Sequence, residues 1–179
     1  MTPLKKDPLL VTAKVVTIIV RIGLVIGMIG LGIAGAVLVI GGTGMFSEHF
    51  VVQLNSSGLG GTKGAALLVI ALTLVSLGLM EDFVRRLGQV IDTVGEGDPF
   101  TLENAARLTR MGWLAIIVQL LGLPVMLLST WLESRIDDGV FQIESNLSLY
   151  GFALALVLFI LARVFRKGAE MREDLEGTV

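Results

Sequence analysis

Four long runs of uncharged residues alternate with charged stretches along the chain. The runs cover residues 22–47, 64–80, 111–132 and 145–162 and contain 26, 17, 22 and 18 residues. A hydrocarbon core about 30 Å thick is crossed by about 20 helical residues. Because a bilayer offers no water to unpaired backbone groups, each run must close its hydrogen bonds within a helix. The pattern predicts four transmembrane spans, at about residues 17–42, 63–82, 111–132 and 146–165.

The composition agrees with residence in a membrane. Apolar residues make up 54% of the chain and charged residues 17%, and the mean hydropathy is +0.83. Soluble domains have about 45–50% apolar and about 25% charged residues. We therefore expect an all-α fold, a four-helix transmembrane bundle that forms a single integral membrane domain over residues 1–179.

The first run has a second interpretation as a cleavable signal sequence, because it follows a basic segment. Its apolar stretch is far longer than the about 7–15 residues of a signal h-region, and no convincing cleavage motif follows. We expect the first helix to be retained. The glycine-rich stretch 41–44 is expected to end it.

Lysine and arginine residues lie mostly on one side of the predicted spans. Of the 14, only Lys63 and Arg135 fall in the first and third loops. The positive-inside rule therefore places both termini and the central loop in the cytoplasm. Trp113 and Trp131 are 18 residues apart, or about 27 Å along a helix. That spacing matches the two aromatic belts at the membrane interfaces.

The central loop, residues 83–110, has the pattern of a helical hairpin. Apolar residues recur at helical spacing after the second span, so that helix is predicted to continue beyond the membrane. Gly and Pro in GEGDPF predict a turn, set by Pro99, Phe100 and Thr101. Thr101 is a good N-cap, and Glu103 suits the first turn of a helix that begins at about Leu102.

The C-terminal tail, residues 166–179, allows two interpretations. It forms either a basic collar with a solvated end, or a helix that packs on the hairpin as a small cytoplasmic platform. Phe165 and Met171 are the apolar residues available for such packing. On the other side of the membrane, the β-prone stretches 50–54 and 140–143 either pair as a short ribbon or lie irregularly on the surface.

Side chains suited to catalysis are scarce. The chain has one histidine, His49, and no cysteine, which excludes a zinc site built on a histidine pair and every thiolate site. Asp137 and Asp138 are interpreted as part of a solvated acidic loop. We expect no enzyme activity, no catalytic residue, no metal and no cofactor. The net charge of −2 also argues against direct nucleic-acid binding.

A channel or transporter, small and oligomeric, is the alternative function. The centres of all four runs are uncharged, whereas transport sites usually carry ionisable residues there. Gln119 and Pro124 are the unusual deep residues, and we expect an interhelical hydrogen bond from the first and a kink at the second. Gly23 and Gly27 form a G-x-x-x-G pair, which favours close packing within the bundle or a homo-oligomer.

Two segments resemble the bacterial membrane family called domain of unknown function 2975. The first, GDPFTLENAARLTRMGW, matches the family at Gly97, Pro99, Phe100, Glu103, Asn104, Arg107, Leu108, Gly112 and Trp113. The second, at the C-terminus, matches at Val164, Phe165, Arg166, Gly168, Glu173, Thr178 and Val179. Met171 and Gly177 stand where the family usually has leucine. The resemblance covers the four-span layout and implies a multi-pass protein of the bacterial inner membrane.

The resemblance implies no enzymatic role. Members of the family are often encoded beside small helix-turn-helix regulators, which implies a membrane protein that binds or sequesters such a cytoplasmic partner. The residues expected to bind it are Asn104, Arg107 and Arg110 in the hairpin and Arg166, Arg172 and Glu173 in the tail. The alternative is that these residues only cap and pack the hairpin.

Overall fold

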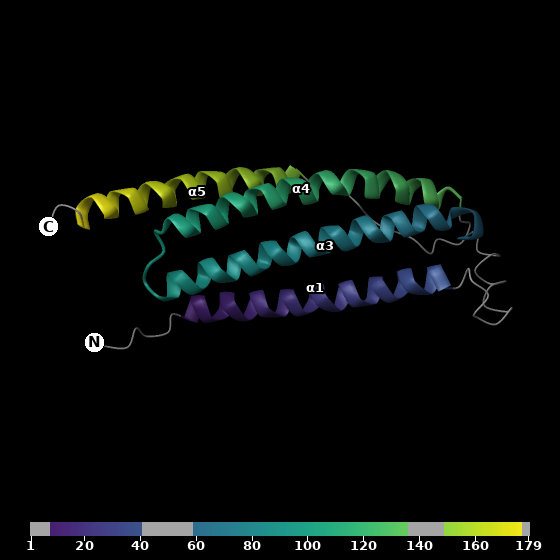
Figure 1. Ribbon diagram of the computed structural model, residues 1–179, viewed down its shortest axis with the longest axis horizontal. Coiled ribbons are helices and arrows are strands. Elements are labelled where there is room, and N and C mark those ends of the chain that lie inside the picture. The colour runs from purple at the N-terminus through teal and green to yellow at the C-terminus, as the bar shows by residue number, and fades with distance from the viewer. Residues whose placement is uncertain (1–7, 41–58, 136–148, 177–179) are drawn as a thin grey trace. The chain divides into compact units, whose positions relative to one another are not determined.

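A computed structural model describes residues 8–40, 59–135 and 149–176. Four helices account for nearly all of them: α1 (Pro8–Ile40), α3 (Leu59–Gly95), α4 (Leu102–Glu133) and α5 (Leu149–Glu176) (Figure 1). No strand occurs within these ranges. The all-α prediction is confirmed. The stretches proposed as a ribbon, 50–54 and 140–143, lie outside the described residues, as do residues 41–44.

All four helices are long and apolar enough to cross a membrane. The longest, α3, has 37 residues, which at 1.5 Å each extend about 55 Å. That is well beyond a hydrocarbon core of about 30 Å. Both α3 and α4, with 32 residues, must therefore extend beyond the bilayer as well as cross it. Their lengths agree with a hairpin that continues two of the spans.

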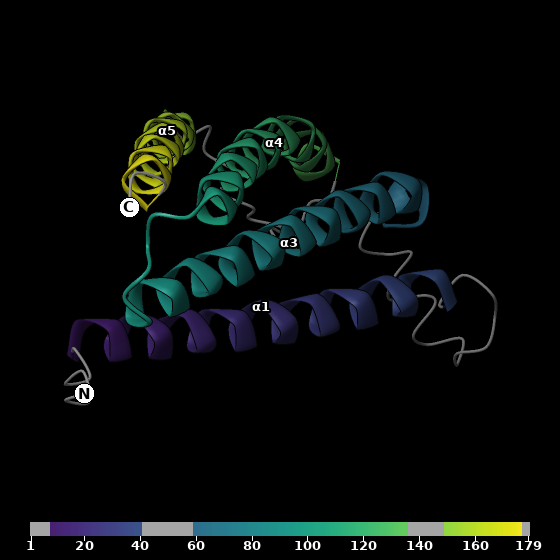
Figure 2. The same ribbon diagram turned by 60° about the vertical axis from the view of Figure 1, so that its left-hand side comes forward.

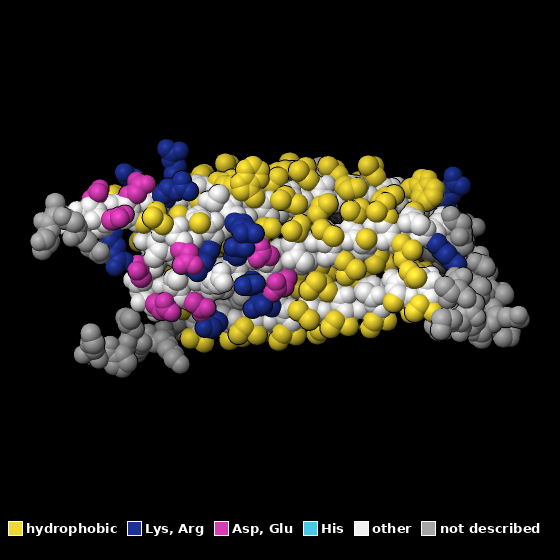
Figure 3. Space-filling model, viewed as in Figure 1, with side chains coloured by type: hydrophobic (Ala, Val, Ile, Leu, Met, Phe, Trp, Pro, Cys, Tyr) yellow, Lys and Arg dark blue, Asp and Glu magenta, His cyan; other side chains and the backbone are white. Residues whose placement is uncertain are grey.

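The chain divides into two compact units. Unit 1 comprises residues 1–24, 79–117 and 148–179, and unit 2 comprises residues 25–78 and 118–147. Most of the charged side chains that the structure describes belong to unit 1. Figure 3 shows charged side chains over the beginning of α1 and the ends of α3 and α5, hydrophobic side chains along the middle stretches of the helices on this face, and a few Lys or Arg side chains at the helices' other ends.

Unit 2 has an apolar core between α3 and α4. Its buried residues are Ala66, Val69, Val125 and Leu132, and Leu38 of α1 packs against them. Polar side chains in this region bond to their own helix. The buried Ser129 hydroxyl, for example, donates to the Val125 carbonyl at 2.7 Å. Such bonds satisfy hydroxyl groups where lipid offers no partner.

Two unusual residues of α4, Gln119 and Pro124, belong to unit 2. The helix continues through Pro124, which occupies an interior position. Gln119 is half-buried, and its side chain forms no hydrogen bond within the described part of the chain, so the interhelical bond expected from it is not observed.

In unit 1, helix α1 lies along α3 (Figure 2). Lys14 pairs with Asp92 and Arg21 with Glu81, each at 2.7 Å. Between these pairs the Thr17 methyl faces Gly88, where an added Cβ would lie 3.5 Å away. Helix α1 begins at Pro8, ahead of the span predicted from about residue 17, and α3 supplies carboxylates to two of its cations.

Candidate interaction surface in unit 1

The turn between α3 and α4 is a Schellman motif centred on Gly97. Its φ of +86° lies in the left-handed region that favours glycine. The N–H of Asp98 donates to the Thr93 carbonyl and that of Gly97 to the Val94 carbonyl, each at 3.2 Å. These two bonds define the motif and satisfy carbonyls at the end of α3. The Gly- and Pro-rich turn is therefore confirmed.

Helix α4 begins at Leu102, as predicted, and Thr101 is its N-cap. The Thr101 hydroxyl accepts a hydrogen bond from the N–H of Asn104 at 3.1 Å. Glu103 occupies the first turn, where a carboxylate is favoured by the helix dipole. The turn and the start of α4 are thus fixed by local hydrogen bonds.

Asn104 connects α3, the turn and α4. It is fully buried, and its Nδ2 donates to the Thr93 hydroxyl at 2.7 Å and to the Pro99 carbonyl at 2.9 Å. Its Oδ1 accepts from Arg107 at 2.8 Å. Both amide donors and the carbonyl oxygen therefore have partners, as burial requires. Asn104 holds the two arms of the hairpin together.

Arg107 also faces inward. Only 15% of its side chain is exposed, and besides Asn104 it contacts the Glu103 carboxylate one turn earlier. The guanidinium thus joins the first turn of α4 to the buried amide of Asn104. The positive charge of Arg107 is therefore paired with Glu103 within the hairpin.

Phe100 packs the turn against α5. Its ring packs against that of Phe165 with centroids 5.1 Å apart. The same ring covers Gly168, where an added Cβ would lie 2.7 Å from Phe100 Cδ1. No real Cβ approaches another carbon so closely, so a residue with a side chain at position 168 would displace the Phe100 ring. Arg172, one turn further along α5, forms an ion pair with Asp98 of the turn.

A second close approach joins α4 to α5. A Cβ at Gly112 would lie 2.8 Å from Phe159 Cε1, and the next residue, Trp113, packs edge-on against the same ring with centroids 5.6 Å apart. Leu108, Met111, Leu158 and Ala162 form the buried core between these helices, with Phe83 and Phe165 packed on it. We call the contacts of Phe100, Leu108 and Gly112 with α5 the seam.

The seam decides between the two interpretations of the tail. The stretch of α5 beyond Ala162 packs on the hairpin through Phe165, Gly168 and Arg172 instead of extending free. The apolar and ionic contacts together form one folded unit from two segments distant in the sequence. The second interpretation, a tail packed on the hairpin, is the one that the structure adopts.

The six residues expected to bind a partner fall into two groups. Asn104 and Arg107 are bonded inside the hairpin, and Arg172 is tied to Asp98. Arg110, Arg166 and Glu173 are exposed on α4 and α5. Asn104 and Arg107 are therefore largely withdrawn from a partner protein, whereas Arg172 is exposed but paired, and the second group is exposed.

Sequence reasoning gave no role to Phe159, which fills the space above Gly112. A phenylalanine within a long apolar run carries no signal of its own, and Gly112 and Trp113 entered the sequence analysis only as family matches and, for Trp113, as an interfacial aromatic residue. Among the described residues no group of three or more His, Cys, Asp or Glu side chains is placed to hold a metal ion. His49, Asp137 and Asp138 lie outside the residues described.

The helices and the seam together define a multi-pass, all-α membrane protein with a folded charged unit built from the hairpin and the last helix. The chain belongs to the DUF2975 family, described as a protein of unknown function, which matches residues 61–179. The match covers α3, α4 and α5 and leaves α1 outside, so it is narrower than the four-span resemblance. No curated protein and no solved structure matches the chain.

Proposed function

We propose that this protein is a non-enzymatic membrane anchor whose hairpin and tail bind a small cytoplasmic helix-turn-helix regulator. It resides in the bacterial inner membrane with both termini in the cytoplasm. The observation that carries the proposal is the seam: the residues typical of the family hold the tail on the hairpin and so build one charged surface from two segments.

A surface held in this way is suited to binding. Rigid side chains lose less entropy when a partner docks than a solvated tail would. Arg107 and Arg172 serve to hold the unit together. Arg110 and Glu173 are exposed, and neither forms an ion pair with another described residue. The surface thus carries exposed charges of both signs. A partner with complementary charges would dock on it in one orientation.

Photocrosslinking in living cells tests the proposal. A photoreactive amino acid placed at Arg110 or Glu173 should attach to one reproducible small DNA-binding protein. Leu127 is the control position, because its side chain is 70% exposed on the apolar part of α4 in unit 2. The proposal fails if positions 110 and 173 capture only lipid, or the same products as position 127.

The identified partner then allows a binding measurement. Charge reversal in Arg110→Glu should weaken binding of the purified partner at least about ten-fold, because a like charge would replace an attractive one. Lys63→Glu is the matched control, since Lys63 belongs to unit 2. Equal affinity for both variants would show that α4 does not contribute to the interface.

A further inference from the structure

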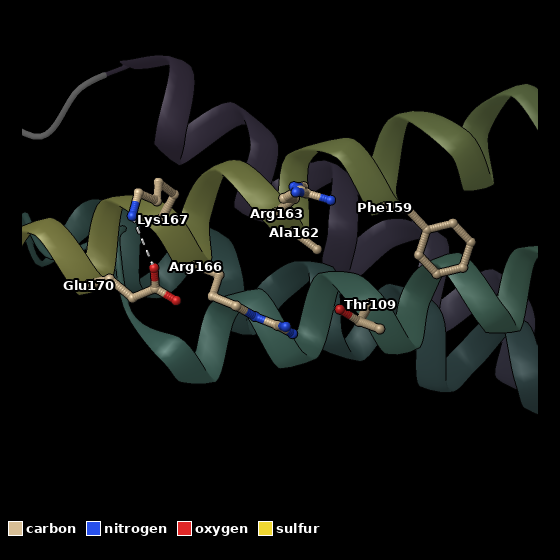
Figure 4. Close-up of a pocket in the computed structure, with 7 residues that line it drawn as sticks. All are labelled: Thr109, Phe159, Ala162, Arg163, Arg166, Lys167 and Glu170. Atoms are coloured by element: carbon tan, nitrogen blue, oxygen red, sulfur yellow. Dashed lines mark hydrogen bonds and ion pairs between the residues drawn. The ribbon is translucent and has the colours of Figure 1, made fainter.

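A basic cavity lies between α4 and α5 within unit 1. Its volume is about 680 Å³, and it is lined by Thr109, Phe159, Ala162, Arg163, Arg166, Lys167 and Glu170 (Figure 4). Figure 4 shows Arg166 extending from α5 towards α4, where Thr109 lies. Phe159 is at one end of the cavity, and Lys167 with Glu170 is at the other. The cavity therefore has an aromatic end and a charged end.

The cations of the cavity outnumber its carboxylates. Lys167 is 3.4 Å from the Glu170 carboxylate, which neutralises that pair. Arg163 and Arg166 are exposed and form no ion pair with any residue that the structure describes. The lining side chains thus leave a net formal charge of +2, carried by two arginines that lie one turn apart on α5.

The cavity lies where α5 changes from apolar to charged. The uncharged run of residues 145–162 ends immediately before Arg163. One and two turns earlier, Ile160 and Leu156 expose 56% and 61% of their surface, as lipid-facing residues do. Trp113, packed on Phe159, is itself 57% exposed. Tryptophan prefers the level of the lipid headgroups, so the aromatic end of the cavity marks that level.

We propose that this cavity binds the phosphate of an anionic phospholipid. Guanidinium groups form paired hydrogen bonds with phosphate oxygens, and Arg163 and Arg166 supply two such groups. The acyl chains would lie along Leu156 and Ile160, which continue the same helix into the apolar region. Basic pockets between membrane helices are known sites for lipid headgroups. This assignment does not depend on the proposed function, because it concerns the lipid-facing boundary and not a protein partner.

Fluorescence quenching tests the assignment in the full-length protein. Trp131→Phe leaves Trp113 as the single tryptophan, beside the cavity. The protein is placed in phosphatidylcholine vesicles that contain either brominated phosphatidylglycerol or brominated phosphatidylcholine. We expect the anionic lipid to quench Trp113 selectively, and the preference to fall about five-fold for each arginine removed in Arg163→Gln and Arg166→Gln.

The same quenching assay includes a control variant and two results that would contradict the assignment. Arg85→Gln removes one exposed arginine outside the cavity and should leave the preference unchanged. Equal quenching by both lipids would overturn the assignment. Loss of the anionic preference on adding inorganic phosphate would also overturn it, because the site would then serve a soluble anion and not a lipid.

Discussion

Asn104 illustrates why a residue's type does not reveal its role. As a polar residue followed by Arg107 and Arg110 it is easily interpreted as a contact for a partner, yet it is fully buried in the hairpin. What places it there is the N-cap at Thr101, which sets the first turn of α4 and aims the amide at Thr93. Because its amide group is bonded to Thr93, Pro99 and Arg107, the Asn104 side chain serves to link α3, the turn and α4.

Replacing Asn104 should therefore destabilise the hairpin. Asn104→Ala leaves the Thr93 hydroxyl, the Pro99 carbonyl and Arg107 without their bonds to the amide. Unsatisfied buried groups cost about 1–3 kcal/mol. Unfolding of the detergent-solubilised protein should show this loss, and amide hydrogen exchange should accelerate in the turn. Arg110→Ala, on the exposed face, should change stability by less than about 0.5 kcal/mol. Equal effects of the two substitutions would refute the role given to Asn104.

Among the elements, the C-terminal helix is the one whose packing sequence reasoning left open. The start of α4, its N-cap and the glycine turn depend on neighbouring residues, so periodicity and capping rules predicted them. The contact of Phe100 with Gly168 joins positions far apart in the sequence. A glycine that packs under an aromatic ring and a glycine in a solvated tail have the same local sequence pattern. The neighbours of Gly168 in the sequence therefore could not decide between the two interpretations of the tail.

Alanine at Gly168 tests the packing of α5 on the turn. An added Cβ meets Phe100 at 2.7 Å, so Gly168→Ala should destabilise unit 1, although alanine normally stabilises a helix by about 0.5–1 kcal/mol over glycine. Gly78→Ala is the control, because nothing lies within 4 Å of its Cβ position. It should be neutral or stabilising.

A double-mutant cycle completes that test. Adding Phe100→Ala to Gly168→Ala removes the obstructing ring, so the cost of the two changes together should be less than the sum of the single costs. Strict additivity in thermal unfolding would mean that the ring and the glycine do not touch in the folded protein.

At the scale of the whole molecule, hydropathy predicted the four apolar helices because the bilayer leaves so few alternatives for a backbone. The same pattern could not give the start of α1, since Lys14 and Arg21 interrupt it. Their carboxylate partners on α3 lie 78 and 60 positions away in the sequence. The proposed function takes the charged unit to be cytoplasmic, an orientation that the positive-inside rule predicts from the distribution of lysine and arginine.

One measurement tests the folded hairpin and tail together with their sidedness. The chain has no cysteine, so Asp98→Cys with Arg172→Cys introduces the only two thiols, at a contact between the turn and α5. A short, membrane-impermeant bismaleimide should bridge them within one chain in inside-out vesicles and leave them unreacted in right-side-out vesicles. Modification of each thiol separately, or bridging from the outer face, would contradict the account.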